Sequence, residues 1–207
     1  MNIYVEGGGN SKELRVECRR GFFEFLKKAD LAGNMPRIVA CGTRADAYDS
    51  FKTAIAAGKE SMLLVDSEAP VSDDCQCGDA ENWRPWVHLK TYDSWDRPAK
   101  ARDADCHLMT QCMEAWFIAD RAVLEKFFGQ GFNAGQLSVI SAGKPLEKIP
   151  KKEIYTGLKK ASQHCKTKYP YGKGAHSFKI LALIDPQKIM GESPWAKRFV
   201  DKLNRKA

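Results

Sequence analysis

The chain has 207 residues, of which 43% are hydrophobic and 29% are charged. These proportions are ordinary for a globular protein, and they exclude a collagen-like, mucin-like or wholly disordered chain. The net charge of +7 is unevenly divided, because residues 1–120 carry −5 and residues 121–207 carry +12. A basic half of this kind attracts phosphate polymers such as nucleic acids, although lysine-rich helices can also be merely soluble.

No apolar run approaches the roughly 20 residues that a membrane-spanning helix needs, and the first residues lack the segments of a signal peptide. We therefore expect a cytoplasmic protein that has no membrane partner and keeps its seven cysteines reduced. Cys75 and Cys77, with His88 downstream, suggest zinc. Zinc sites usually space a cysteine pair by two to four residues and need four ligands, so we expect an exposed loop here instead.

The first 65 residues predict the order strand, helix, strand, helix, strand. The strands are expected at Asn2–Val5, Arg37–Cys41 and Ser61–Val65, with helices between them at 45–57 and from the N-cap Ser11 to about Ala29. The third strand is apolar throughout, which indicates burial on both faces of a parallel sheet covered by helices. The order predicts an α/β fold with a mostly parallel central sheet flanked by helices.

The rest of the chain is expected to complete a single domain over residues 1–207. A polar loop region at 67–104, with a short extended piece at Trp86–Leu89, precedes a fourth strand at Cys106–Thr110 and a helix at 113–128. Glycines and prolines mark a linker after residue 128, and three short helices are expected at about 151–164, 177–184 and 194–204. We divide the domain into a core, 1–128, and a basic helical extension, 129–207.

Four carboxylates follow the predicted strands. Glu6 ends the first strand, Asp66 and Glu68 follow the third, and Glu114 follows the fourth. Ligands of such sheets bind at the carboxyl ends of the strands, so these side chains are expected to converge. Converging carboxylates repel one another unless a cation holds them, and oxygen ligands favour Mg²⁺ or Mn²⁺ over zinc. The alternative is that each is a solvated cap at the start of a loop.

Two of these segments carry a family resemblance. Val5-Glu6-Gly7 and Leu63-Leu64-Val65-Asp66-Ser67-Glu68 resemble the Toprim signature, a Glu after the first strand and an Asp-x-Asp after the third. Glu68 departs from that pattern, because the second Asp is usual at its position. Met109–Phe117 resembles the Glu-bearing helix start of the nuclease-like Toprim branch, which includes the overcoming-lysogenization-defect (OLD) family. The whole chain resembles an uncharacterised bacterial Toprim-like family that is often encoded beside AAA or ABC-type ATPases in phage-defence loci.

The resemblance implies a Toprim-like fold and a nuclease. Glu6, Asp66, Glu68 and Glu114 would hold Mg²⁺ or Mn²⁺ and act as the catalytic carboxylates, and the metal would activate water to cleave a phosphodiester bond. No Gly-rich motif ending in Lys-Ser or Lys-Thr is present, so any use of ATP must come from a separately encoded ATPase partner.

Two basic groups could bind the phosphates of a nucleic acid. Lys12, Arg15 and Arg19 lie along one line of the first helix, and Lys173 and His176 lie in a glycine-rich loop that opens a later helix. Lys173 is also expected to be catalytic, by neutralising charge that develops in the transition state. Two other functions stay open: a non-catalytic module that docks on an ATPase or a nucleic acid, and a hydrolase of small phosphate compounds. The departure at Glu68 favours the docking module. The basic second half of the chain is harder to reconcile with a hydrolase of small phosphate compounds.

Overall fold

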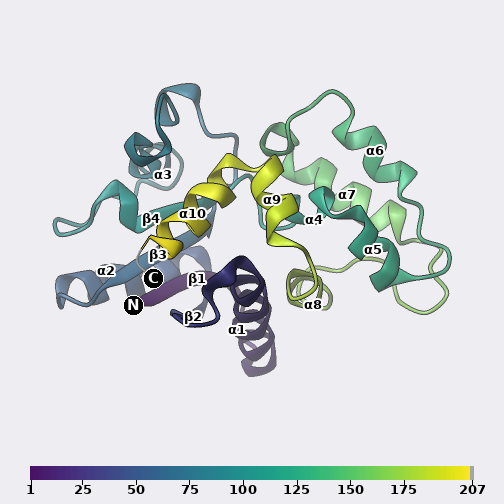
Figure 1. The fold of residues 1–207 in the computed structure, drawn as a ribbon, viewed down its shortest axis with the longest axis horizontal. Coiled ribbons are helices and arrows are strands. Elements are labelled where there is room, and N and C mark those ends of the chain that lie inside the picture. Colours follow the sequence, from purple (N-terminus) through teal and green to yellow (C-terminus); the bar gives the residue numbers. More distant parts are fainter. Residues whose placement is uncertain (206–207) are drawn as a thin grey trace.

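The computed structural model describes residues 1–205, and its strands form one four-stranded sheet. The strands are β1 (Asn2–Gly8), β2 (Arg37–Gly42), β3 (Ser61–Asp66) and β4 (Cys106–Met109). Their order is β2-β1-β3-β4, and every neighbouring pair is parallel. The four predicted strands and the α/β class are confirmed. Because β1 and β3 are central neighbours, their carboxyl ends lie side by side (Figure 1).

Helices cover both faces of the sheet. Successive residues of a strand point to opposite faces, so Leu64 joins the core beneath α1 (Lys12–Leu26), whereas Leu63 and Val65 join the core beneath α2 (Arg44–Ala56). All six residues of β3 are buried. The prediction that this strand is covered on both sides is therefore confirmed.

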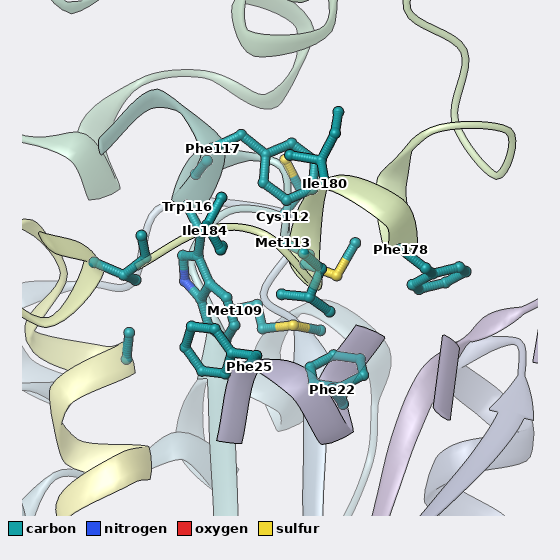
Figure 2. Packing of buried hydrophobic residues seen from close by; sticks show 14 of the residues in the cluster. Phe22, Phe25, Met109, Cys112, Met113, Trp116, Phe117, Phe178, Ile180 and Ile184 are labelled. Atoms are coloured by element: carbon teal, nitrogen blue, oxygen red, sulfur yellow. The ribbon is translucent and has the colours of Figure 1, made fainter. Parts of the chain in front are cut away.

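The larger core, on the α1 face, is closed by residues that follow β4. Figure 2 shows Phe22 and Phe25 of α1 packed against Met109, Met113 and Trp116. The rings of Phe25 and Trp116 are stacked with their centroids 5.3 Å apart. Trp116 lies on α4 (Ala115–Ala119), and α8 (Ser177–Leu181) contributes further apolar side chains to the same cluster. The backbone that leaves β4 is thereby fixed against the sheet, at the edge where the carboxylates were expected.

The prediction of an extended piece at Trp86–Leu89 is wrong, because this segment lies in the helix α3 (Pro85–Asp93). Pro85 occupies the first turn, where its missing N–H costs nothing, and Ser94 ends the helix with a left-handed φ of 60°. Trp86 is buried against Phe51, with ring centroids 5.8 Å apart. The apolar residues that suggested a strand cover the α2 face of the sheet as a helix.

The single helix predicted over 113–128 is also wrong, because Asp120 divides it into α4 and α5 (Arg121–Phe128). The Asp120 backbone is not helical, with φ −121° and ψ 66°. Its buried carboxylate accepts hydrogen bonds from the Asp185 backbone N–H and the Lys188 ammonium group at 3.0 and 2.6 Å. These long-range partners replace the helical continuation that local periodicity predicts.

Five α-helices follow α5 within residues 1–205, with a 3-10 turn at Leu146–Lys148 between the first two of them. They are α6 (Gly135–Ser141), α7 (Lys151–Ala161), α8, α9 (Pro186–Glu192) and α10 (Pro194–Asn204). The three expected helices are present, whereas α6 inside the expected linker and α9 are additional. Figure 1 shows α5, α6 and α7 grouped to one side, while α10 returns to the sheet beside β4. No helix among the described residues is both long and apolar enough to cross a bilayer.

Candidate metal centre

Three carboxylates meet at the carboxyl edge of the two central strands. Glu6, Asp66 and Glu68 each offer one oxygen, and these oxygens all lie within 4.8 Å of one another. Glu6 lies inside β1 rather than at its end, because β1 continues to Gly8. The Asp66 backbone N–H donates to Glu6 Oε2 at 3.0 Å, which ties the two strands together. The structure therefore brings together three of the four carboxylates that the sequence places at this edge.

Glu68 joins the group through a turn rather than through extended backbone. Its φ is 61°, a left-handed value that is uncommon for a residue other than glycine. The Glu68 backbone N–H donates to the Gln111 carbonyl at 2.9 Å, and the Ser67 N–H donates to the Met109 carbonyl at 3.0 Å. These bonds hold the β3 loop against the segment that follows β4. The longer arm of Glu68 reaches the cluster from this turned position.

Asp66 is the most enclosed member of the three. Its side chain is 4% exposed, and Oδ1 accepts the Met113 backbone N–H at 2.8 Å. Burial raises the pKa of Asp66 well above its ordinary value, and the negative charges of Glu6 and Glu114 raise it further. Burial likewise raises the pKa of Glu6, against the opposing hydrogen bond from Asp66. A buried group of like charges at this density is the environment in which a bound cation is stabilised.

Two lysines supply positive charge to the cluster. Lys173 Nζ lies 3.9 Å from Asp66 Oδ2, so the predicted approach of this residue to the site is observed. Lys151, which the sequence did not single out, lies 3.5 Å from the same oxygen and donates to Glu68 Oε1 at 2.5 Å. Lys151 is the first residue of α7. A cation is unfavourable in the first turn of a helix, and this unusual position was the only local signal for its role.

Glu114 lies beside the three carboxylates but is held by hydroxyl groups. It is fully buried, and its oxygens accept hydrogen bonds from Tyr155, Tyr171 and Ser177 at 2.9, 3.0 and 3.1 Å. Burial and the Glu114 charge raise the pKa of both tyrosines, so their hydroxyls stay protonated and donate. Glu114 is thus outside the group of three oxygens within 4.8 Å, and its charge acts on Asp66 from the wall of the site.

Arg44 is a second site residue that sequence reasoning missed. Its Nε donates to the Asp66 carbonyl at 3.0 Å and lies 3.6 Å from Glu6 Oε2. The rest of the guanidinium forms a two-pronged pair with the Asp93 carboxylate and lies over the Trp95 ring at 5.0 Å. Arg44 therefore fixes both the end of β3 and the Glu6 carboxylate. No local motif marks it, because its partners come from three separate segments.

A cavity of about 150 Å³ opens beside the carboxylates. Its polar lining is Glu6, Asp66, Glu114, Lys173 and Ser177, and its apolar lining comes from α1, α8 and the residues around Met113. Gly8 and Gly9 form one rim. A Cβ at Gly8 would lie 2.7 Å from Arg15 Cα, and φ there is +87°, so only glycine fits. The absence of a side chain at Gly8 therefore lets this rim of the cavity pack directly against α1.

The other predicted phosphate-binding residues lie apart from the cavity lining. Lys12 and Arg19 are exposed on α1. Arg15 donates to the Gly9 carbonyl at 3.0 Å and so stabilises the glycine turn. His176 Nδ1 accepts the Gly172 backbone N–H at 3.1 Å, and burial lowers its pKa, which favours the neutral ring. His176 thus closes its own loop, whereas Lys173 of the same loop reaches the carboxylates.

The cysteine pair considered for zinc does not form a metal-binding group with His88. Among residues 1–205, Glu6, Asp66 and Glu68 are the group of three or more potential ligands that the structure brings together. Cys75 is buried, Cys77 is exposed and contacts the Asp73 carbonyl, and His88 Nε2 is 2.8 Å from the Ser67 carbonyl. The donors of the candidate metal centre are therefore carboxylate oxygens, the ligands that suit Mg²⁺ or Mn²⁺.

Comparison with known proteins identifies a family for the chain. A family model described as a domain of unknown function (DUF4276) matches residues 5–204, a range that contains every residue of the candidate metal centre. No curated protein and no solved structure matches the chain.

Proposed function

We propose that this chain, which belongs to the DUF4276 family, is a nuclease that uses Mg²⁺ or Mn²⁺ to hydrolyse a phosphodiester bond. The observation that carries the proposal is the convergence of Glu6, Asp66 and Glu68 at the carboxyl edge of neighbouring parallel strands. This edge is where open α/β sheets bind their ligands. In the proposed role, water adds to phosphorus, and the bond to one sugar oxygen breaks.

The donor set fits a hard divalent cation. All three groups are carboxylates, and two of them have pKa values raised by burial and mutual repulsion. A bound cation would offset the repulsion between these carboxylates. Lys151 and Lys173 offset it only in part, because Lys173 is 55% exposed. When bound, the metal would polarise the scissile phosphate and lower the pKa of the attacking water.

The surrounding residues have separate roles in this proposal. Arg44 and the Asp66 backbone hold Glu6, and the Met113 backbone holds Asp66, so the ligands are oriented before a metal arrives. Lys173, on the cavity wall, is placed to neutralise charge on the phosphate oxygens. Glu114 strengthens the attraction for a cation without offering a free oxygen.

The Toprim-like relationship belongs to the same proposal. It is supported by a Glu on the first strand and an Asp at the end of the third, on strands that are neighbours in the sheet. The resemblance, with the absence of an ATP-binding motif from the sequence, leads us to propose a separately encoded ATPase as partner and a role as the nuclease of a phage-defence pair. The net charge of +12 over residues 121–207 suits a nucleic-acid substrate.

A second candidate function is a non-catalytic module that docks on an ATPase or a nucleic acid. The observation in its favour is the short contact between Lys151 and Glu68, in which an ammonium group occupies a carboxylate oxygen that a metal would need as its ligand. The two candidates differ in whether Mn²⁺ displaces this ion pair. Binding of Mn²⁺ favours the nuclease, and its absence favours the docking module.

The decisive experiment measures cleavage of plasmid DNA and total RNA in Mg²⁺, in Mn²⁺ and in EDTA, with and without ATP and any ATPase encoded beside this chain. Asp66→Asn should abolish cleavage, and Glu68→Gln should reduce it. Asp49→Asn, which alters an exposed carboxylate on α2, is the matched control and should cleave normally. Cleavage in EDTA, or undiminished cleavage by Asp66→Asn, would contradict the proposal.

A further inference from the structure

The segment that joins α7 to α8 carries only positive charge. It spans residues 162–176, and the longer stretch 154–184, which includes most of α7 and all of α8, contains six lysines and no aspartate or glutamate. Lys166 is exposed in this segment, and Lys168 lies with its ammonium group 4.8 Å from the centre of the Phe127 ring. The Lys166 backbone N–H donates to the Gln130 carbonyl at 3.0 Å, which fixes the segment beside the α5–α6 connection at the outer edge of the molecule (Figure 1).

An aromatic ring projects from this basic segment into solvent. Tyr169 is 87% exposed, more than any other large hydrophobic side chain among the described residues. It lies between Lys168 and Pro170. The proline fixes its own φ and restricts the backbone of Tyr169, which precedes it. A ring with this exposure contributes little to the core. Such a ring is available to a ligand at little conformational cost.

The residues that follow Tyr169 anchor the segment at the candidate metal centre. Tyr171 donates to Glu114 at 3.0 Å, and Lys173 lies 3.9 Å from Asp66. One residue, Pro170, separates Tyr169 from Tyr171, so their Cα atoms are at most about 7 Å apart. The exposed ring therefore lies in the same segment that supplies Lys173 to the lining of the cavity.

We propose that residues 163–173 form a subsite for single-stranded nucleic acid, in which Tyr169 stacks on an unpaired base of a strand that reaches the metal centre past Lys173. Stacking on an aromatic side chain suits any base, and the neighbouring lysines suit the phosphates on either side of it. In a duplex the flat faces of the bases are covered by their neighbours, so Tyr169 has no base to stack on. The proposal deepens the nuclease function and rests on it for the position of the scissile phosphate.

The test is fluorescence anisotropy with labelled single-stranded DNA, single-stranded RNA and duplex DNA in EDTA, where cleavage is suppressed. Tyr169→Ala should weaken binding of one or both single strands by roughly 5- to 150-fold, the effect of losing one stacked base. Tyr169→Phe keeps the ring and should bind within about twofold of the unchanged protein. Duplex binding should be the same for all three. The two single-stranded probes distinguish a DNA from an RNA substrate.

The lysine contribution has a separate readout. Lys166→Ala should reduce the slope of log affinity against log salt by about 0.7 for a single strand, as expected for one lost phosphate contact. Lys59→Ala is the matched control, because Lys59 is exposed at the amino end of β3, away from the metal centre, and its slope should not change.

Equal single-strand affinity of Tyr169→Ala and the unchanged protein would overturn the subsite, as would a complete lack of single-strand binding or the same loss on duplex. These results are independent of catalysis. Tyr169-dependent binding without metal-dependent cleavage would support the subsite and count against the nuclease function alone.

Discussion

Asp66→Asn removes one negative charge from the carboxylate cluster while preserving the size of the side chain and an oxygen that can accept the Met113 N–H. At an effective dielectric constant of about 20, like charges within 4.8 Å of each other repel by at least about 3.5 kcal/mol, whereas opposite charges 3.5 Å apart attract by about 4.7 kcal/mol. The substitution thus relieves a repulsion by Glu6 and loses an attraction to Lys151 of similar size. We expect the metal-free stability to change by no more than about 1–2 kcal/mol.

Metal binding should respond very differently. In the unchanged protein, Mn²⁺ at about 100 times its dissociation constant should raise the free energy of unfolding by about 2.7 kcal/mol. Asp66→Asn should lose most of this increase, because it removes the charge of the most enclosed ligand. The assay is urea unfolding of both proteins in EDTA and in Mn²⁺, followed by tryptophan fluorescence.

Two outcomes would refute this reasoning. A loss of about 3–5 kcal/mol in EDTA would identify Asp66 as one half of a structural buried ion pair. An unchanged Mn²⁺ effect in the variant would show that the metal binds elsewhere. Asp49→Asn, on the exposed face of α2, should match the unchanged protein in both conditions.

The pH dependence of the metal-free protein provides an independent check on the same cluster. The folded pKa values of Glu6 and Asp66 are raised, so the folded state binds protons more tightly than the unfolded chain. Their contribution to stability is therefore complete below the unfolded pKa of about 4 and is lost as pH rises through the folded values. Asp66→Asn should flatten this part of the profile, and an unchanged profile would contradict the raised pKa of Asp66.

Three further predictions concern the surroundings of the site. Lys173→Ala should slow cleavage by roughly 10²–10³-fold in single-turnover kinetics, while urea unfolding still shows stabilisation by Mn²⁺. A parallel loss of cleavage and of Mn²⁺ stabilisation would show that Lys173 is structural. Arg44→Gln should weaken Mn²⁺ binding in calorimetry. Arg44→Lys should not restore the binding, because an ammonium group cannot reproduce the paired contacts of a guanidinium. Full rescue by lysine would contradict the positioning role of Arg44. Gly8→Ala should destabilise the fold by about 1–3 kcal/mol in urea, because alanine is strained at φ +87° and its Cβ meets the α1 backbone, and an unaltered midpoint would show that the turn can relax.

The sequence by itself determined the sheet and most of the carboxylate cluster. The strands were recognisable because apolar runs such as Ser61–Val65 are bounded by glycine and polar residues, and burial on both faces distinguishes a parallel sheet. Parallel topology then places the strand ends at one edge. Glu6, Asp66 and Glu68 were therefore predictable as neighbours although about 60 residues separate the first from the others.

Tertiary structure decided the elements whose local pattern was ambiguous. The apolar residues of Trp86–Leu89 are compatible with a strand or a helix, and packing of Trp86 on Phe51 accompanies the helix. Asp120 lies in a helical pattern, yet hydrogen bonds from Asp185 and Lys188, more than 60 residues away, accompany the break between α4 and α5. Neither outcome is contained in a window of neighbouring residues.

The same limit applies to the charges around the site. Arg44 reaches Asp93 and the end of β3, Lys151 reaches Asp66 across 85 residues, and Glu114 finds its hydroxyl partners on α7 and beyond. Lysine, arginine and tyrosine have no positional pattern that identifies such partners, because a long polar side chain can be solvated at almost any exposed position. Only burial of the strand ends, which removes water from the carboxylates, makes these distant donors necessary and fixes which ones reach them.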